Sequence, residues 1–99
     1  MKGDFNQLIQ SDRPVLIDFF ATWCGPCQMI PPILNEVKTT LKEDVRIIKI
    51  DIDKNKALAD RFNVRSVPTL MIFRKGEVKW RLSGVPPHDM IVDAVRAAV

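Results

Sequence analysis

The sequence predicts an α/β fold of three layers, in which helices cover both faces of a mixed sheet of about four strands. An almost unbroken apolar run, 15–20, is typical of a strand that is covered on both faces. Apolar residues then recur at spacings of three and four over 27–41, which predicts a long helix. Two further apolar segments, 69–73 and 78–82, flank Lys75-Gly76 and predict an antiparallel hairpin.

The first elements are marked by residues that start and stop helices. Asp4 is placed to cap a short helix whose apolar residues are Phe5, Leu8 and Ile9, and Arg13-Pro14 ends that helix. In the long helix that follows, Pro32 has no N–H to donate and is expected to cause a kink about one turn after Cys27.

The second half of the chain completes the sheet and its covering helices. Segment 45–52 is apolar enough for a second strand, and 55–62 predicts a short helix with its apolar side chains turned inward. In 78–82, apolar and basic residues alternate, so this strand should have one wet face and lie near an edge. The last helix, 91–98, is amphipathic, and Pro87 suits its first turn. We therefore expect a parallel pair joined by a helix, followed by an antiparallel pair.

Length and charge favour a single-domain protein and argue against a nucleic-acid-binding or membrane-spanning protein. The chain has 99 residues, which suits a single domain over 1–99. The formal net charge is +3, and the basic residues are scattered among acids, which argues against a nucleic-acid reader. No apolar stretch approaches the ~20 residues that span a bilayer, and the start lacks an apolar leader segment. We expect a cytoplasmic monomer that binds neither nucleic acid nor membrane, with both thiols in a reducing compartment.

The two cysteines carry the chemistry. Cys24 stands at the start of the predicted long helix, where unpaired N–H groups favour a thiolate, and Cys27 lies one turn deeper on the same face. Gly25 allows a sharp turn, and Pro26 occupies a position whose N–H would have no partner. This arrangement predicts that Cys24 attacks a disulfide and that Cys27, which should be less exposed, resolves the mixed disulfide.

A Cys-x-x-Cys pair has three other common uses. A zinc site needs two more ligands, and His88 is the only other soft ligand in the sequence. Haem attachment requires His directly after the second cysteine, where this chain has Gln28. A purely structural disulfide that closes so small a loop would add little stability. The sequence therefore favours redox chemistry without a metal.

Three landmarks, taken in order, resemble the thioredoxin family: the run from Val15 to Cys27, the tripeptide Val67-Pro68-Thr69, and Gly84 at the expected spacing. The resemblance covers the chain from about Asp4 to its end and implies the thioredoxin fold. Family members usually have a strand ahead of the first helix. Only three residues precede Asp4 here, so that strand is expected to be missing and the sheet to have four strands.

The resemblance also implies the positions of the site residues. Pro68 is expected to form a cis peptide bond facing the two sulfurs, and the backbone of Val67 to pair with an extended client segment. Trp23 and the residues of the active-site turn would form an apolar docking surface with residues from the other two landmarks. The members of that surface are Trp23, Gly25, Pro26, Val67, Pro68, Gly84 and Val85.

One acid and one lysine complete the expected site. Asp18 interrupts the apolar run, and burial of a carboxylate there should raise its pKa. The resemblance implies that Asp18 is the buried acid that takes the proton of Cys27 through water. It also implies that Lys49 is its buried partner on the next strand.

The resemblance implies a protein-disulfide reductant that needs no cofactor besides its Cys24–Cys27 pair. The dipeptide Gly25-Pro26 between the cysteines is similar to that of the reductants of the family, whereas isomerases and oxidases carry His there. The implied partners are disulfide-containing clients and an NADPH-dependent flavoprotein thioredoxin reductase. Two alternatives stay open: an extracytoplasmic thiol–disulfide oxidoreductase for dedicated clients, and a binding module that uses the same apolar surface without catalysis.

Overall fold

The computed structural model describes residues 4–99, and its elements follow the predicted order. Two short 3-10 helices, η1 and η2, accompany the four α-helices and four strands of this range. The elements are α1 (Phe5–Ile9), β1 (Val15–Phe20), η1 (Pro26–Met29), α2 (Ile30–Leu41), η2 (Lys42–Asp44), β2 (Arg46–Asp51), α3 (Lys56–Arg61), β3 (Thr69–Arg74), β4 (Glu77–Ser83) and α4 (His88–Ala97).

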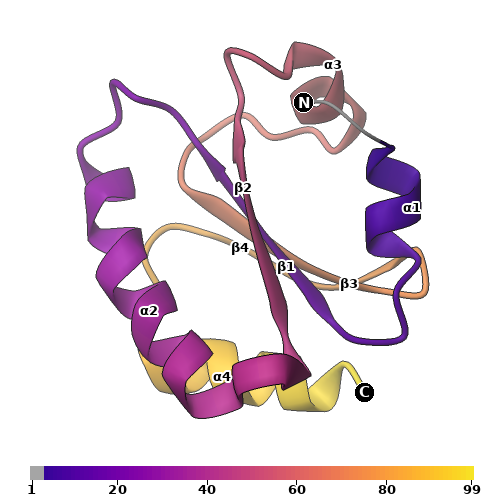
Figure 1. Ribbon diagram of the computed structural model, residues 1–99. Helices are drawn as coiled ribbons and strands as arrows, with labels where there is room; N and C mark the ends of the chain where they lie inside the picture. The colour runs from indigo at the N-terminus through magenta and orange to yellow at the C-terminus, as the bar shows by residue number, and fades with distance from the viewer. Residues whose placement is uncertain (1–3) are drawn as a thin grey trace.

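The sheet has the strand order β2-β1-β3-β4. β1 pairs parallel with β2 and antiparallel with β3, and β3 pairs antiparallel with β4. Helices α2 and α4 cover one face, while α1 and α3 cover the other (Figure 1). The predicted four-stranded mixed sheet with helices on both faces is confirmed.

Alternation along β1 separates two apolar cores. Leu16 points into the core under α2 and α4, whereas Ile17 and Phe19 point into the core under α1 and α3. The run is apolar throughout because both faces are covered, as its buried pattern shows. β1 therefore runs through the centre of the molecule, and its carboxyl end leads directly into the cysteine turn.

Local sequence signals correctly predicted the start of α1 and the turn between β3 and β4. The Asp4 side chain caps α1 by accepting the N–H of Asn6 at 2.9 Å. Lys75 and Gly76 both have positive φ, 52° and 81°, as a tight two-residue hairpin turn requires. A Cβ at Gly76 would meet only the far end of the flexible Gln10 side chain, which can move aside, so glycine is favoured there mainly by its positive φ.

The predicted long helix differs from the observed one at its start. Residues 26–29 form the 3-10 helix η1, and α2 begins only at Ile30. Pro31 and Pro32 therefore lie in the first turn of an α-helix, where a missing N–H costs nothing, and not in the interior. The change from 3-10 to α geometry falls at Ile30, directly before these two prolines.

Two smaller expectations also needed correction. The first helix ends at Ile9, ahead of Arg13-Pro14. In β4 the alternation is weaker than predicted, because Val78 is exposed and Trp80 is only half-buried against the core under α2 and α4. A β-bulge shifts the pairing between Ile72 and Phe73, opposite this part of β4.

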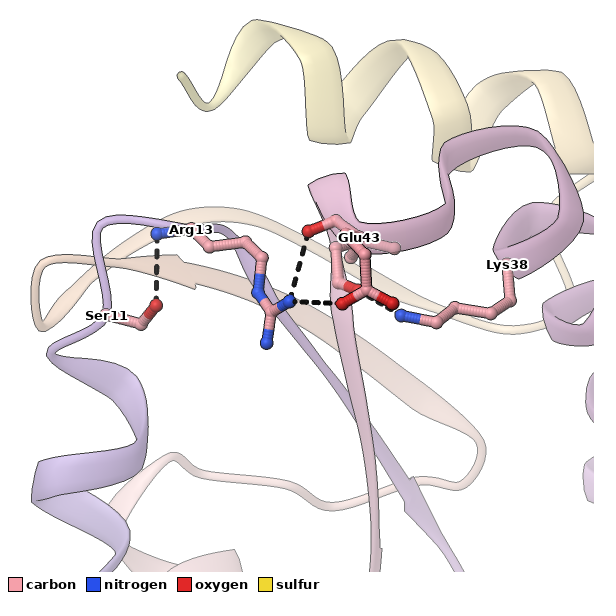
Figure 2. Close-up of polar contacts among 5 residues, drawn as sticks. Ser11, Arg13, Lys38 and Glu43 are labelled. Carbon is pink, nitrogen blue, oxygen red and sulfur yellow. Dashed lines mark hydrogen bonds and ion pairs between the residues drawn. The ribbon is translucent and has the colours of Figure 1, made fainter.

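The end of the sheet far from the cysteine turn is fastened by long side chains. The Arg13 guanidinium donates to both the backbone carbonyl (3.1 Å) and the carboxylate (3.0 Å) of Glu43, as Figure 2 shows. Nearby, the Lys38 amine donates at 2.6 Å to the carbonyl of Val45, the residue before β2. These contacts tie η2 to the segment before β1, and α2 to the residue before β2.

Candidate active site: a cysteine pair beside a cis-proline

The turn after β1 holds Cys24 and Cys27 in a disulfide, with their Cα atoms 5.4 Å apart. The backbone N–H of Cys27 points at the Sγ of Cys24 at 3.2 Å. An N–H in that position stabilises negative charge on the sulfur when the disulfide is opened. Gly25 accepts the N–H of Gln28 at 3.0 Å and so starts η1 directly between the cysteines.

The two cysteines are buried almost equally, at 5% exposed for Cys24 and 7% for Cys27. The expectation that Cys27 would be clearly less exposed is therefore wrong for the disulfide form. The reason is that Cys24 is covered by a neighbouring loop: its Sγ lies 3.5 Å from the carbonyl oxygen of Val67. Ala21 and the half-buried Phe20 and Val67 pack against the pair.

The loop before β3 carries the cis peptide bond Val67–Pro68 that the resemblance implied. Pro68 is buried, and its carbonyl accepts the N–H of Gly84 at 2.9 Å. The buried Thr69 hydroxyl lies 2.8 Å from both the Ser66 carbonyl and the Ser83 hydroxyl. These bonds hold the landmarks from two distant parts of the chain together beside the cysteines.

Trp23 is the most prominent apolar residue at this site, with 69% of its surface exposed. Its indole N–H donates to the carboxylate of Asp53 at 2.8 Å, and the Asp53 N–H donates to the carboxylate of Asp51 at 2.8 Å. Asp53 is a site residue that was not predicted from the sequence. No local pattern marks it, because the contact joins residues thirty positions apart.

The remaining residues of the expected docking surface are unequally exposed. Gly25 and Pro26 are exposed, while Val67 and Gly84 are half-buried. Val85 packs against the core under α2 and α4, so it contributes less open surface than expected. Among the described residues, the exposed Met29 on η1 adds an apolar side chain that the sequence analysis did not single out.

Asp18 is buried in the middle of β1, with 1% of its surface exposed and one carboxylate oxygen, Oδ1, without a hydrogen-bond partner among the described residues. Burial raises the pKa of the Asp18 carboxyl from 3.8 to about 6, against the opposing charge of Lys49. The prediction of a buried acid with a raised pKa is confirmed. A carboxyl that titrates near neutral pH can both accept and return a proton.

Lys49 is paired with Asp18 in the register of β1 and β2, but its side chain is not buried. Its Cα is paired with that of Asp18 across β1 and β2. The side chain is exposed, and its amine lies 5.0 Å from the ring centroid of Phe20. The expectation of a buried lysine is therefore wrong, because β2 is an edge strand and the long side chain extends to solvent.

His88, the other ligand weighed for zinc, lies at the start of α4. Its ring nitrogens lie 2.8 Å from the Thr40 hydroxyl and 2.7 Å from the Asp89 carboxylate. Residues 4–99 contain no group of three or more His, Cys, Asp or Glu that could hold a metal ion. In the same range, none of the helices has the length and apolar character needed to cross a membrane.

Comparisons with known proteins agree with this geometry. The family model of thioredoxin matches residues 1–97. The chain is 45% identical over 94 residues to the chloroplastic thioredoxin Y2 of Arabidopsis thaliana, which covers 94% of this chain and 56% of that protein. It is 38% identical over 93 residues to the thioredoxin of Rickettsia felis, covering 94% of this chain and 89% of that protein.

A solved structure of a mutant thioredoxin from Halobacterium salinarum superposes with a TM-score of 0.85 at 35% identity, covering 99% of this chain and 87% of that one. The relatives thus include chloroplastic and bacterial proteins. A match of this extent places the chain in the thioredoxin family, whose members are oxidoreductases that act on thiol–disulfide bonds and need no cofactor besides their own cysteine pair.

Proposed function

We propose that this chain is a protein-disulfide reductant in which Cys24 is the attacking thiolate and Cys27 the resolving thiol. Cys24 attacks one sulfur of a client disulfide, forms a mixed disulfide and releases the first client thiolate. Cys27 then attacks Cys24, which closes the Cys24–Cys27 disulfide and releases the second client thiolate, so two electrons pass to the client. The observation that carries this assignment is the Cys27 N–H, which lies 3.2 Å from the Cys24 sulfur.

Within this proposal, Asp18 takes the proton of Cys27 during resolution. Its support is a buried carboxyl with a pKa near 6, next to the turn that holds the cysteines. In this proposal a water carries the proton from Cys27 to Asp18. Lys49 acts at longer range, since its charge favours the carboxylate form of Asp18.

Client binding is proposed to use the rim around the cysteines. Val67 presents its carbonyl 3.5 Å from the Cys24 sulfur, where an extended client segment can pair with the backbone. Trp23, Gly25 and Pro26 form one side of this rim, and Pro68, Gly84 and Val85 complete the other side. The indole fixed by Asp53 presents a large apolar area at little cost in side-chain entropy.

The physiological setting is also part of the proposal. The chain would act as a single-domain monomer over 1–99 in the cytoplasm or another reducing compartment. A flavoprotein thioredoxin reductase that draws on NADPH would return the Cys24–Cys27 disulfide to the dithiol. The similarity to the thioredoxins of Arabidopsis thaliana and Rickettsia felis supports a thiol-reducing role.

The test is NADPH-coupled reduction of insulin with a generic thioredoxin reductase. Cys24→Ser should lower turnover by at least about a thousand-fold, because the nucleophile is lost. Cys27→Ser should accumulate a mixed disulfide through Cys24, visible as a mass adduct that a reductant removes. Thr39→Ser, a small change on the exposed side of α2, should leave turnover unchanged.

Two results would redirect the assignment. Rapid oxidation of a reduced unfolded protein, with no coupling to the reductase, would favour an oxidase that acts outside the cytoplasm. Retention of the biological role after Ser replacement of both Cys24 and Cys27 would favour a binding module.

A further inference from the structure

Strand β2 forms one edge of the sheet (Figure 1). In a parallel pair, alternate residues direct their N–H and C=O groups toward the neighbouring strand. Arg46 and Ile52 donate to the carbonyls of Pro14 (3.0 Å) and Phe20 (2.9 Å), so the even-numbered residues of this segment face β1. Ile47, Lys49 and Asp51 therefore direct their backbone groups away from the sheet.

Side chains cap both ends of this outward-facing row. The Lys38 amine donates to the Val45 carbonyl at 2.6 Å, and the Asn55 side-chain amide donates to the Asp51 carbonyl at 3.0 Å. Between these caps, the outward N–H and C=O groups of Ile47 and Lys49 have no partner among the described residues. The open part of the edge is thus short and lies between two fixed ends.

A groove of about 430 Å³ runs beside this open edge, between α2 and β2. Its apolar lining comes from Pro31, Leu34 and Ile47. Its charged lining is wholly basic, and no acidic residue lines it. The polar lining residues are Asn35, Lys38, Arg46 and Lys49. An edge with unpaired backbone groups and a basic wall is complementary to a chain that is extended and acidic.

We propose that the edge of β2 and this groove form a docking site for an extended acidic segment of a partner protein, which adds a strand at Ile47 and Lys49. Carboxylates of that segment would meet Lys38, Arg46 and Lys49. A second copy of this chain fits less well, because self-pairing along β2 would gather two sets of the same cations, and exposed basic residues discourage such pairing. The site contains neither cysteine and does not depend on the proposed reductase activity.

The experiment uses the full chain in its disulfide form and a capped peptide of alternating Glu and Val, about eight residues long and free of cysteine. Backbone amide spectra and hydrogen exchange report binding at individual residues. The amides of Ile47 and Lys49 should exchange rapidly in the free protein and become protected when the peptide is added. A peptide of alternating Lys and Val should produce no protection.

Matched variants test the charge argument. Arg46→Glu should weaken peptide binding by at least about five-fold, since one attraction becomes a repulsion. Lys79→Glu makes the same charge change on β4, the other edge strand, and should weaken binding by less than about two-fold. Arg46→Glu should keep its insulin-reducing turnover, which separates this site from the cysteine chemistry.

Several results would overturn the proposal. Protection of the Ile47 and Lys49 amides in the free protein at low concentration would show that the edge is already occupied. Protection that grows with protein concentration would assign the edge to a second copy. Equal weakening by Arg46→Glu and Lys79→Glu, or equal binding of the Lys–Val peptide, would show that the groove does not select acidic chains.

Discussion

The two faces of the sheet bury different kinds of side chain. Under α1 and α3, four phenylalanine rings pack together, with Phe62 central to the group: its ring centroid lies 5.6 Å from that of Phe5, 6.4 Å from that of Phe19 and 5.3 Å from that of Phe73. The Phe5 and Phe73 rings meet edge to face, a favourable geometry for aromatic pairs. No charged side chain is buried on this face among the described residues.

Under α2 and α4, the core is mainly aliphatic, and the same face of β1 contains a buried carboxylate. Leu16 and Asp18 alternate with the residues that serve the other face. The carboxylate of Asp18 is desolvated by burial, and the positive charge of the exposed Lys49 offsets this cost only in part. A charge in this position opposes folding, since burial disfavours the ionised form.

Stability and chemistry are therefore divided between the two faces of the sheet. One face is a wholly apolar support, and the other accepts a destabilising acid two residues before the end of the strand that leads to Cys24 and Cys27. The first face contributes stability and contributes no ionisable group to the site, whereas the second accepts a loss of stability for a group that titrates near neutral pH. Substitutions on the two faces should therefore change different observables.

The largest effect on stability is expected from Phe73→Ala on the apolar face. Phe73 is fully buried and contacts two other rings, so its truncation should cost about 3–5 kcal/mol of unfolding free energy. Chemical denaturation measures the loss, and the reduction potential of the cysteine pair should stay unchanged in the folded protein. Val78→Ala, an exposed control on β4, should cost little. A loss below about 1 kcal/mol for Phe73→Ala would contradict the division between the faces.

A smaller effect of opposite sign is expected from Asp18→Asn. Because the folded-state pKa is raised from 3.8 to about 6, the folded protein loses stability as the pH rises through this window. The full cost, about 3 kcal/mol at most, is present above neutral pH and absent below pH 4. The amide removes this cost but leaves its own polar groups to satisfy, so we expect a gain of about 1–3 kcal/mol at pH 8 and almost none at pH 4.

Denaturation of Asp18→Asn at both pH values measures the gain, and Asp93→Asn on the exposed side of α4 serves as the control. The same variant tests the proposed chemistry, since it should slow the release of the mixed disulfide while leaving its formation intact. If the variant is more stable at pH 8 but resolves the mixed disulfide at the normal rate, Asp18 affects stability and has no part in the resolution step.

Much of this division was predictable from the sequence because the signals are local. The continuous apolar run of β1 indicates two covered faces, and Asp18 stands out in it as the one charged residue. The cysteine spacing and the turn signal at Lys75-Gly76 are likewise contained within a few residues. The cis bond before Pro68 came from the resemblance, since most prolines in this setting are trans.

Features that depend on distant residues could not be predicted. The burial of Cys24 depends on the Val67 carbonyl, which comes from a loop more than forty residues away. The bond from Trp23 to Asp53 has no sequence pattern. The exposure of Lys49 follows from the position of β2 at the edge, which is a property of the whole sheet.

The smallest effect is expected from Lys49→Gln. This variant tests the electrostatic environment of Asp18 on the face covered by α2 and α4. The Lys49 charge lowers the pKa of Asp18, so its removal should move that pKa further upward. Lys49 is exposed and its charge is screened, so the unfolding free energy at pH 8 should fall by less than about 1 kcal/mol and stay constant at pH 4. Carboxyl-carbon titration by NMR measures the shift, and Lys79→Gln on β4 is the matched control. If the Asp18 titration does not move, the carboxylate is governed by burial alone, and Lys49 has no part in tuning it; a rise as large as that caused by burial would instead make the pair the dominant interaction of this face.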